Sequence, residues 1–411
     1  MDQHVAVLGL GYIGLPTAAM MALSGYQVTG VDLSADRVDS INEGRVPFVE
    51  PALGGIVEKM VAGGRLRAQT QCPTADVFII AVPTPFMGDG HRVDTSYIDA
   101  ATDAIIPHLR GNELVILEST SPPGTTERLV SRITDARPAL TNLAFAHAPE
   151  RVLPGRIMEE IVTNDRIIGG VTPSAAERTR QLYASFCKGQ LHLTDARTAE
   201  MTKLTENAFR DVNIAFANEL SLVCDELDID VWELIRLANK HPRVNILQPG
   251  PGVGGHCIAV DPWFIVSTSP TSARLIRMAR EVNDSKPSWV LNKVRQAAEQ
   301  VDRPVIAVLG LAFKPDIDDL RESPALAIAE ALPGLLPEAT VLAVEPHVQT
   351  LPGALASRGV KLADLASAIP RADIVLLLVD HAQFRDIDAR AWSDKIVIDT
   401  RGVLRGTRGP L

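Results

Sequence analysis

The chain has 411 residues, of which 46% are hydrophobic and 22% charged, and its formal net charge is −10. This length favours more than one domain, and the composition is that of an ordinary soluble globular protein rather than a disordered or fibrous one. The negative charge and the absence of a dense Lys/Arg tract argue against a protein that binds nucleic-acid backbones.

Apolar β-type runs alternate with helical segments in the first half of the chain: HVAVLGL, YQVTGVD, DVFIIAV, ELVILES and LAFAHAP. A long helix is predicted from about Thr198 to 227, and βα alternation returns after Arg303. Such alternation predicts parallel sheets. We therefore expect an α/β protein with two Rossmann-like doubly wound domains joined by a helical middle domain. The predicted ranges are 1–195, 196–300 and 301–411.

The sequence shows no secretion signal, and its longest apolar runs are of strand length. We therefore expect a cytoplasmic protein without membrane insertion. The four cysteines, Cys72, Cys187, Cys224 and Cys257, form no CxxC pair and are too scattered for a disulfide framework. We expect thiols and no metal site.

Gly9, Gly11 and Gly14 form a GxGxxG pattern between a predicted strand and a predicted helix. The first glycine allows a tight turn, the second lets the backbone approach a pyrophosphate, and the third lets the helix pack on the strand. Tyr12 and Ile13 belong to the same loop. The pattern predicts a dinucleotide site, although a glycine-rich turn without a ligand has the same letters.

Asp32 ends the next predicted strand, where it can accept hydrogen bonds from the adenosine ribose. This position favours NAD over NADP, because a carboxylate repels the 2′-phosphate of NADP. Arg37 is the opposing signal, since its cation could bind that phosphate. We expect NAD.

The segment GPGVGGHCIAVDPWF, residues 250–264, places Cys257 in a glycine-rich loop with His256 before it and Asp261 four residues after it. Glycines admit a substrate close to the backbone, and a neighbouring cation favours the thiolate. A catalytic cysteine and a buried structural thiol both fit this segment.

Glu200, Lys203, Asn207 and Arg210 share one face of the predicted long helix. Such a row is often no more than a solvated charged stripe. An amide beside a lysine also suits an oxygen that becomes negative during a reaction.

Five further segments match motifs of a known family. They are VPTP at 82–85, ESTSPPGT at 118–125, APERVLPG at 148–155, HPRVNIL at 241–247 and FKPDIDDLRESP at 313–324. With the motifs above they resemble the UDP-glucose/UDP-N-acetylhexosamine dehydrogenase family from Val5 to Gly402. The segments around residues 148 and 241–264 are most similar to members that act on UDP-N-acetyl-D-mannosamine. The resemblance implies oxidation of C6 to the carboxylate in two NAD-dependent steps, through a thioester on Cys257.

The resemblance also implies roles for matching positions. Cys257 is the expected nucleophile, Lys203 the acid/base or oxyanion-stabilising group, and Asn207 its neighbour. The residues expected to contact NAD are Gly9, Gly11, Tyr12, Ile13, Gly14, Asp32, Thr84, Thr120 and Arg321. Those expected to contact the UDP-sugar are Arg151, Val152, Lys203, Asn207, Arg210, His241, Arg243, Gly254 and Lys314. Arg243 is expected to reach a neighbouring subunit, which implies a homodimer through the helical middle.

One position departs from the family pattern. Where UDP-glucose dehydrogenases carry an acid four residues after the position of Glu150, this chain has Pro154. Glu150 and Asp261 are then the candidates for activating the water that hydrolyses the thioester.

Three alternatives stay open at this point. The same chemistry could act on UDP-N-acetylglucosamine or UDP-glucose. A single-step hydroxy-acid dehydrogenase shares the Rossmann domain and the lysine-asparagine helix but has no need of Cys257. A sensor that binds NAD or a nucleotide sugar without turnover would not need Lys203, Asn207, Cys257 and Asp261 together.

Overall fold

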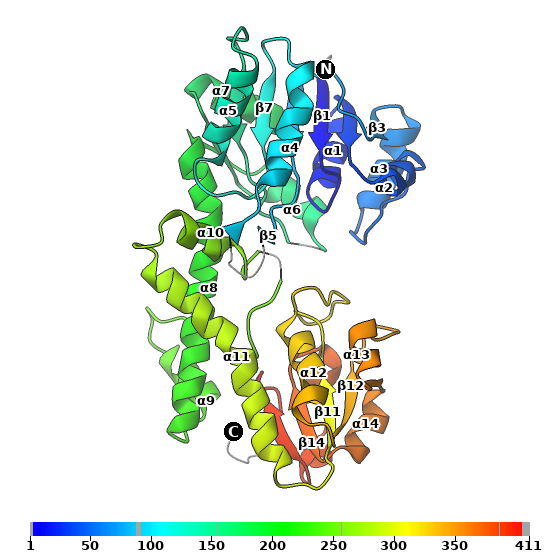
Figure 1. Ribbon diagram of the computed structural model, residues 1–411, viewed down its shortest axis with the longest axis vertical. Coiled ribbons are helices and arrows are strands. Elements are labelled where there is room, and N and C mark those ends of the chain that lie inside the picture. Colours follow the sequence, from blue (N-terminus) through cyan, green and yellow to red (C-terminus); the bar gives the residue numbers. More distant parts are fainter. Residues whose placement is uncertain (1–2, 88–91, 154, 256, 386, 405–411) are drawn as a thin grey trace. The chain divides into compact units, whose positions relative to one another are not determined.

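The computed structural model describes residues 3–87, 92–153, 155–255, 257–385 and 387–404 (Figure 1). The chain divides into two compact units, Met1–Glu206 with Ser267–Ser269, and Asn207–Val266 with Pro270–Leu411. Pro154 and His256, both noted in the sequence, lie outside the described residues. Within the described ranges we find no helix with the length and apolar character needed to span a membrane.

The first unit contains a sheet with the strand order β10-β9-β8-β7-β4-β1-β2-β3. Neighbouring strands run parallel except for β8 and β9, which are antiparallel. The strands are β1 (His4–Leu8), β2 (Gln27–Val31), β3 (Leu66–Gln69), β4 (Val77–Ile80), β7 (Leu114–Leu117), β8 (Ala144–His147), β9 (Arg166–Gly170) and β10 (Leu191–Asp195). From β3 to β8 this is the order of a dinucleotide-binding sheet, in which the ligand crevice lies where the order reverses, between β1 and β4.

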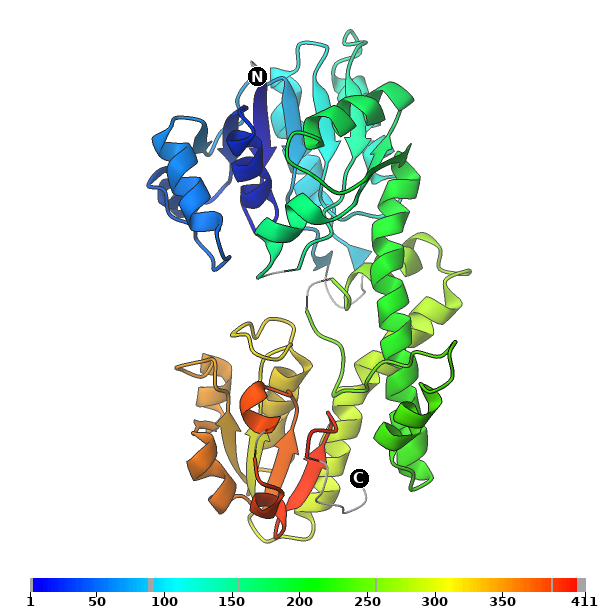
Figure 2. The same cartoon turned by 180° about the vertical axis from the view of Figure 1, so that it is seen from behind.

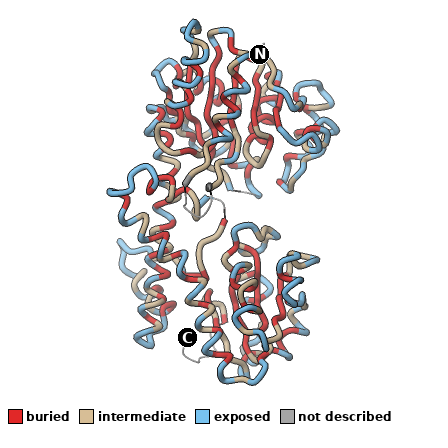
Figure 3. Tube along the Cα trace, in the orientation of Figure 1, coloured by how far each residue is buried: buried red, intermediate tan, exposed pale blue. Residues whose placement is uncertain are grey.

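Helices cover both faces of this sheet (Figure 2). They are α1 (Gly14–Leu23), α2 (Ala35–Asn42), α3 (Leu53–Ala62), α4 (Ser96–Ile105) with the 3₁₀ turn η2 (Ile106–His108), α5 (Thr125–Ala136), α6 (Ile157–Thr163) and α7 (Pro173–Tyr183). Alternate residues of β1 enter opposite cores: Val5 and Val7 pack with α1 and α3, whereas Ala6 and Leu8 pack with α4 and α5. A strand that is buried on both faces must be apolar throughout, which explains the continuous runs in the sequence (Figure 3). A short hairpin joins β5 (Phe86–Met87) and β6 (Arg92–Val93).

The second unit contains a parallel sheet with the order β13-β12-β11-β14-β15. Its strands are β11 (Val305–Leu309), β12 (Thr340–Val344), β13 (Lys361–Leu362), β14 (Ile374–Leu377) and β15 (Ile396–Asp399). One face packs on α12 (Pro324–Leu335) and on Val290 and Val294, and the other packs on α14 (Leu365–Arg371). The remaining elements of this sheet are α13 (Gly353–Ser357), α15 (Ala382–Arg385) and the 3₁₀ turn η3 (Ala389–Trp392).

The helical middle consists of α8 (Ala196–Glu226), α9 (Val231–Ala238), α10 (Asp261–Thr268) and α11 (Arg274–Ala298). With 31 residues, α8 spans about 46 Å. Buried polar side chains join α8 to α11: Arg280 pairs with Asp211 at 2.6 Å, and the Asn218 amide donates to Asn283 at 2.8 Å. The predicted α/β class with two doubly wound sheets and a long central helix is confirmed. The predicted domain ranges stay predictions.

Candidate active site

The glycine-rich turn after β1 has the geometry that a dinucleotide needs. Gly9 has a φ of +91°, and a Cβ there would lie 2.5 Å from the carbonyl oxygen of Ala81, after β4. A Cβ on Gly14 would overlap the carbonyl of Gly9. A Cβ on Gly11 would meet no heavy atom within 4 Å, so this glycine leaves room beside the backbone. Two glycines therefore serve packing and the third leaves space for a phosphate at the start of α1, which fits a bound dinucleotide.

Asp32 is a buried carboxylate at the end of β2, as the sequence predicts. It accepts hydrogen bonds from the backbone N–H of Leu10 at 2.9 Å and of Ser34 at 3.0 Å, and it pairs with Arg37 at 2.9 Å. Burial alone would raise the pKa of Asp32, but these hydrogen bonds and the Arg37 cation together hold the pKa below its ordinary value. The residue is therefore ionised, and Arg37, the possible 2′-phosphate ligand, is paired with it.

Thr84 and Thr120 meet directly in the first unit. They follow β4 and β7, and the Thr84 hydroxyl donates to the carbonyl of Thr120 at 2.9 Å. The Ser119 hydroxyl joins the same two loops by donating to the carbonyl of Val82 at 2.7 Å. Tyr12 stacks on Phe48, with 4.3 Å between ring centroids. Together with Gly9, Ile13 and Asp32, these residues lie at the carboxyl ends of adjacent strands, as the expected NAD contacts should.

Glu150 belongs to a buried cluster of charged side chains with Arg166 and Glu118. Its carboxylate forms an ion pair with Arg166 of β9 and accepts the N–H of Arg151 at 2.8 Å. Arg166 also pairs with Glu118 at 3.3 Å. Burial, opposed by Arg166 and reinforced by Glu150, raises the pKa of Glu118 to about 7. The Tyr183 hydroxyl donates to Glu118 at 2.9 Å.

The loop after β8 carries Arg151 and Val152, both half-buried. The Arg151 guanidinium forms an ion pair with Glu206 of α8 and donates to the carbonyl of Asp165. These contacts fix the loop against α8 within the first unit.

The four polar residues predicted to share one face of α8, Glu200, Lys203, Asn207 and Arg210, differ in their surroundings. Glu200 is buried and accepts the N–H of Gly124 at 2.6 Å and of Thr126 at 2.7 Å, so it caps the start of α5. Lys203 is half-buried, and among the residues that the structure describes none forms an ion pair with its ammonium. Arg210 is exposed.

The second unit brings Asn207, Cys257 and Asp261 together. The Asn207 amide donates to the Asp261 carboxylate at 2.5 Å, and the N–H of Asp261 donates to the carbonyl of Cys257 at 2.8 Å. Asp261 is buried and begins α10, whereas Cys257 is exposed. The other cysteines are buried or half-buried. The exposed thiol lies four residues before the start of α10, where a bound substrate can reach it.

Residues of the second unit hold the loop before Cys257 in place by hydrogen bonds. The N–H of Gly250 donates to Asn218 of α8 at 2.8 Å, and the N–H of Gly255 donates to the carbonyl of Glu322 at 3.3 Å. A Cβ on Gly254 would overlap the carbonyl of Glu322, so no larger residue fits at this position unless the backbone moves.

The remaining expected ligands in the second unit lie on exposed loops. Arg243, whose N–H lies 3.3 Å from Nδ1 of His241, follows α9. Lys314 follows β11, and the Arg321 guanidinium binds the Asp319 carboxylate at 2.6 and 2.9 Å.

Sequence reasoning missed the charges that support these loops. Arg166 is the first residue of the otherwise apolar strand β9, and Glu118 is the first residue of the segment ESTSPPGT. A charged residue at the start of an apolar strand is the one signal that could have indicated a paired cluster.

Models of the UDP-glucose/GDP-mannose dehydrogenase family match successive parts of this chain. The NAD binding domain matches residues 3–187, the central domain matches 197–285 and the UDP binding domain matches 307–406.

Similar proteins match over nearly the whole chain. An NDP-N-acetyl-D-galactosaminuronic acid dehydrogenase of Ralstonia nicotianae is 56% identical over 99% of this chain and 97% of its own length. A UDP-N-acetyl-D-mannosamine dehydrogenase of Salmonella typhi is 53% identical over 98% of this chain and 99% of its own length. The solved structure of UDP-D-ManNAc dehydrogenase from Pyrococcus horikoshii has a TM-score of 0.88 at 38% identity, covering 98% of this chain and 96% of that one.

Proposed function

The chain belongs to the UDP-glucose/GDP-mannose dehydrogenase family of NAD-dependent oxidoreductases, and we propose that it oxidises UDP-N-acetyl-D-mannosamine at C6 to the uronate. The similarity to UDP-N-acetyl-D-mannosamine dehydrogenases over nearly the full chain carries this proposal. For each sugar, one water and two NAD are consumed, and one carboxylate, two NADH and three protons are formed.

A second sugar has support of its own. The relative named NDP-N-acetyl-D-galactosaminuronic acid dehydrogenase is 56% identical to this chain, against 53% for the mannosamine enzyme. UDP-N-acetyl-D-galactosamine is therefore the second candidate substrate. The two sugars differ only in the configuration of ring carbons, which identities this similar do not distinguish.

The deciding experiment measures NADH formation with four UDP-sugars: N-acetylmannosamine, N-acetylgalactosamine, N-acetylglucosamine and glucose. We expect the highest kcat/KM with UDP-N-acetyl-D-mannosamine and two NADH per sugar. A higher kcat/KM with the galactosamine sugar would replace the first proposal by the second. One NADH per sugar would contradict oxidation to the acid.

Cys257 is the proposed nucleophile. Bound NAD supplies the hydride acceptor for each oxidation. The thiolate of Cys257 attacks the C6 aldehyde and forms a C–S bond, which gives a thiohemiacetal and, after the second oxidation, a thioester. Water then breaks the C–S bond and returns the thiolate. The exposure of Cys257 and its position before α10 support this role.

Lys203 and Asn207 are proposed to stabilise negative charge on O6. They lie four residues apart on α8, so their side chains share one face of the helix. The neutral amine form of Lys203 can take up the C6 hydroxyl proton, directly or through water, and the resulting ammonium then faces the negative O6. The bond to Asp261 fixes the plane of the Asn207 amide, so the group needs no reorientation as charge develops.

A homodimer is the proposed assembly, with the second copy covering an apolar stripe of α8. Phe209, Phe216 and Val223 follow one another at intervals of seven residues and are 70%, 52% and 44% exposed. A seven-residue spacing keeps side chains on one side of a helix. Exposed phenylalanines in such a row favour burial against an identical surface.

In this dimer we propose that Arg243 completes the neighbouring subunit's site. Its exposed position after α9 leaves it accessible to a second copy. Two variants that are each impaired in uronate formation, Arg243→Ala and Cys257→Ser, should regain uronate formation when their subunits are mixed and exchanged. Random pairing of equal amounts gives one intact site in each mixed dimer, hence about a quarter of the native activity. Mixtures without activity would contradict the exchange of Arg243 between subunits.

A further inference from the structure

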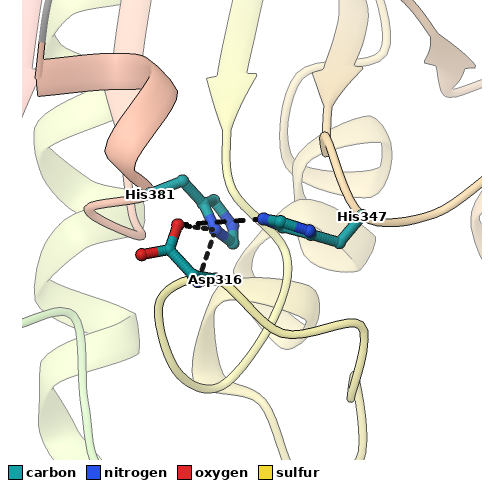
Figure 4. Close-up of side chains that lie close together, drawn as sticks. All are labelled: Asp316, His347 and His381. Carbon is teal, nitrogen blue, oxygen red and sulfur yellow. Dashed lines mark hydrogen bonds and ion pairs between the residues drawn. The ribbon is translucent and has the colours of Figure 1, made fainter.

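Asp316, His347 and His381 gather at the carboxyl end of the second sheet (Figure 4). One ligand atom from each lies within 4.8 Å of the others, the spacing of a candidate metal site. However, both ring nitrogens of His381 are already engaged. The N–H of Asp316 donates to Nδ1 at 2.9 Å, and Nε2 lies 3.1 Å from a carboxylate oxygen of Glu345. A backbone N–H only donates, so Nδ1 is the acceptor and Nε2 carries the proton. The lone pair that a metal would need is therefore in use, and the cluster is a hydrogen-bonded clamp.

Glu345 is the fixed end of this clamp. It directly follows β12 and is buried. One of its carboxylate oxygens faces His381 and also accepts the N–H groups of Leu311 at 2.7 Å and Ala312 at 3.0 Å. Burial alone would raise the pKa of Glu345, but hydrogen bonds from His381 and from Leu311 hold it below its ordinary value. The carboxylate is ionised, so its bonds to the loop and to His381 are charge-assisted.

Asp316 is the residue on which the clamp acts. Its φ of +61° lies in the left-handed region that non-glycine residues seldom adopt. Two bonds maintain this conformation: the N–H of Asp316 to His381, and the N–H of Ala382 to the Asp316 carboxylate at 2.9 Å. Without the imidazole acceptor, the backbone at Asp316 loses one of the two contacts that offset its strain.

Lys314 lies between the two anchored points of this loop. Leu311 and Ala312 are held on one side by Glu345, and Asp316 is held on the other by His381. We propose that Glu345 and His381 are positioning residues that fix the loop 311–316 so that Lys314 meets the UDP part of the substrate. This inference rests on the proposed function and on the expectation, from the family resemblance, that Lys314 contacts the UDP-sugar.

Paired variants of His381 separate its two bonds. In His381→Asn the amide oxygen can take the place of Nδ1 and accept from Asp316, whereas in His381→Gln the amide reaches the place of Nε2 and serves only Glu345. We expect the Kd for UDP, measured by calorimetry, to rise about tenfold in the Gln variant, as the loss of one hydrogen bond implies, and about twofold or less in the Asn variant. The KM for the UDP-sugar should follow, with kcat unchanged.

Asp373→Ala is the matched control, because Asp373 accepts the N–H of Val305 at the opposite end of β11. It should lower the melting temperature and leave the Kd for UDP unchanged. Hydrogen exchange should accelerate at the amide of Asp316 in His381→Gln and not in the control. If Lys314→Ala weakens UDP binding but His381→Gln binds UDP with the same Kd as the native protein, the positioning role of His381 is refuted. A native Kd in Lys314→Ala would instead overturn the role of Lys314 in the proposed function.

Discussion

Loss of the Asp32 charge should shift cofactor preference toward NADP. A carboxylate offers about four lone pairs. Ser34 uses one on Oδ1, and Leu10 and Arg37 use both on Oδ2. One lone pair on Oδ1 is then left for a ribose hydroxyl. Because Arg37 is 41% exposed, it can rotate away and release a second.

The size of the effect follows from these bonds. A hydrogen bond to a charged group contributes about 2 kcal/mol, which corresponds to about 30-fold in KM for NAD. Asp32→Asn removes the charge but keeps an oxygen that can accept from Leu10. Asp32→Ala also leaves the Leu10 N–H without its acceptor, so it should additionally destabilise the glycine-rich turn. Both variants release Arg37, whose cation can then bind the 2′-phosphate of NADP.

The assay compares kcat/KM for NAD and NADP in the native enzyme, Asp32→Asn and Arg37→Ala. The ratio of kcat/KM for NAD to kcat/KM for NADP should fall by about 30-fold or more in Asp32→Asn. In this variant NAD loses a hydrogen bond to the carboxylate, and the 2′-phosphate of NADP is no longer repelled by it. Arg37→Ala, the control, should leave NAD use near native and make NADP use no better. An unchanged ratio in Asp32→Asn would refute this account of cofactor choice.

Three further results are expected. Cys257→Ser should reduce NADH below two per sugar, because a hydroxyl is a poorer nucleophile than a thiolate, and unchanged uronate formation would exclude the thioester. The carboxyl of Glu118 has a pKa of about 7 in the folded chain and 4.5 as its ordinary value, so its contribution to stability is present below pH 4.5 and lost as pH rises through 7. Urea unfolding at pH 5 and 8 should therefore show a pH dependence that Glu118→Gln reduces by about 2–3 kcal/mol, and an equal dependence in both proteins would contradict the raised pKa. Phe209→Glu combined with Phe216→Glu should yield monomers in sedimentation, and an intact dimer would exclude this face as the interface.

The fold could be predicted where the signal is local. Strands such as β4 and β7 are buried on both faces and so appear as unbroken apolar runs, and the helical periodicity from Thr198 identifies α8 to within two residues of its start at Ala196. The hairpin of β5 and β6 and the strand β13 have only two residues each, too few to show a period.

The candidate site could be predicted where a motif carries its own geometry. The glycine pattern predicts a tight turn, a close approach of the backbone to a phosphate and a packing position from six residues. The turn at Gly9 and the packing at Gly14 are found, and Gly11 has open space beside its backbone. The Asn207–Asp261 bond joins residues 54 apart, and the His381–Glu345 bond joins residues 36 apart. Local patterns carry no information on such pairings, because packing of distant segments decides them.

The water that hydrolyses the thioester should depend more on Asp261 than on Glu150. The Glu150 carboxylate is already engaged in a buried cluster, by the ion pair with Arg166 and by the N–H of Arg151. Asp261 is bonded to Asn207 and lies one turn from Cys257. Asp261→Asn should therefore give a burst of two NADH per site and then stall, with an acyl adduct on Cys257 in mass spectra of acid-quenched enzyme. Glu150→Gln should weaken the loop at Arg151 and leave no adduct. An adduct in Glu150→Gln but not in Asp261→Asn would assign the base to Glu150.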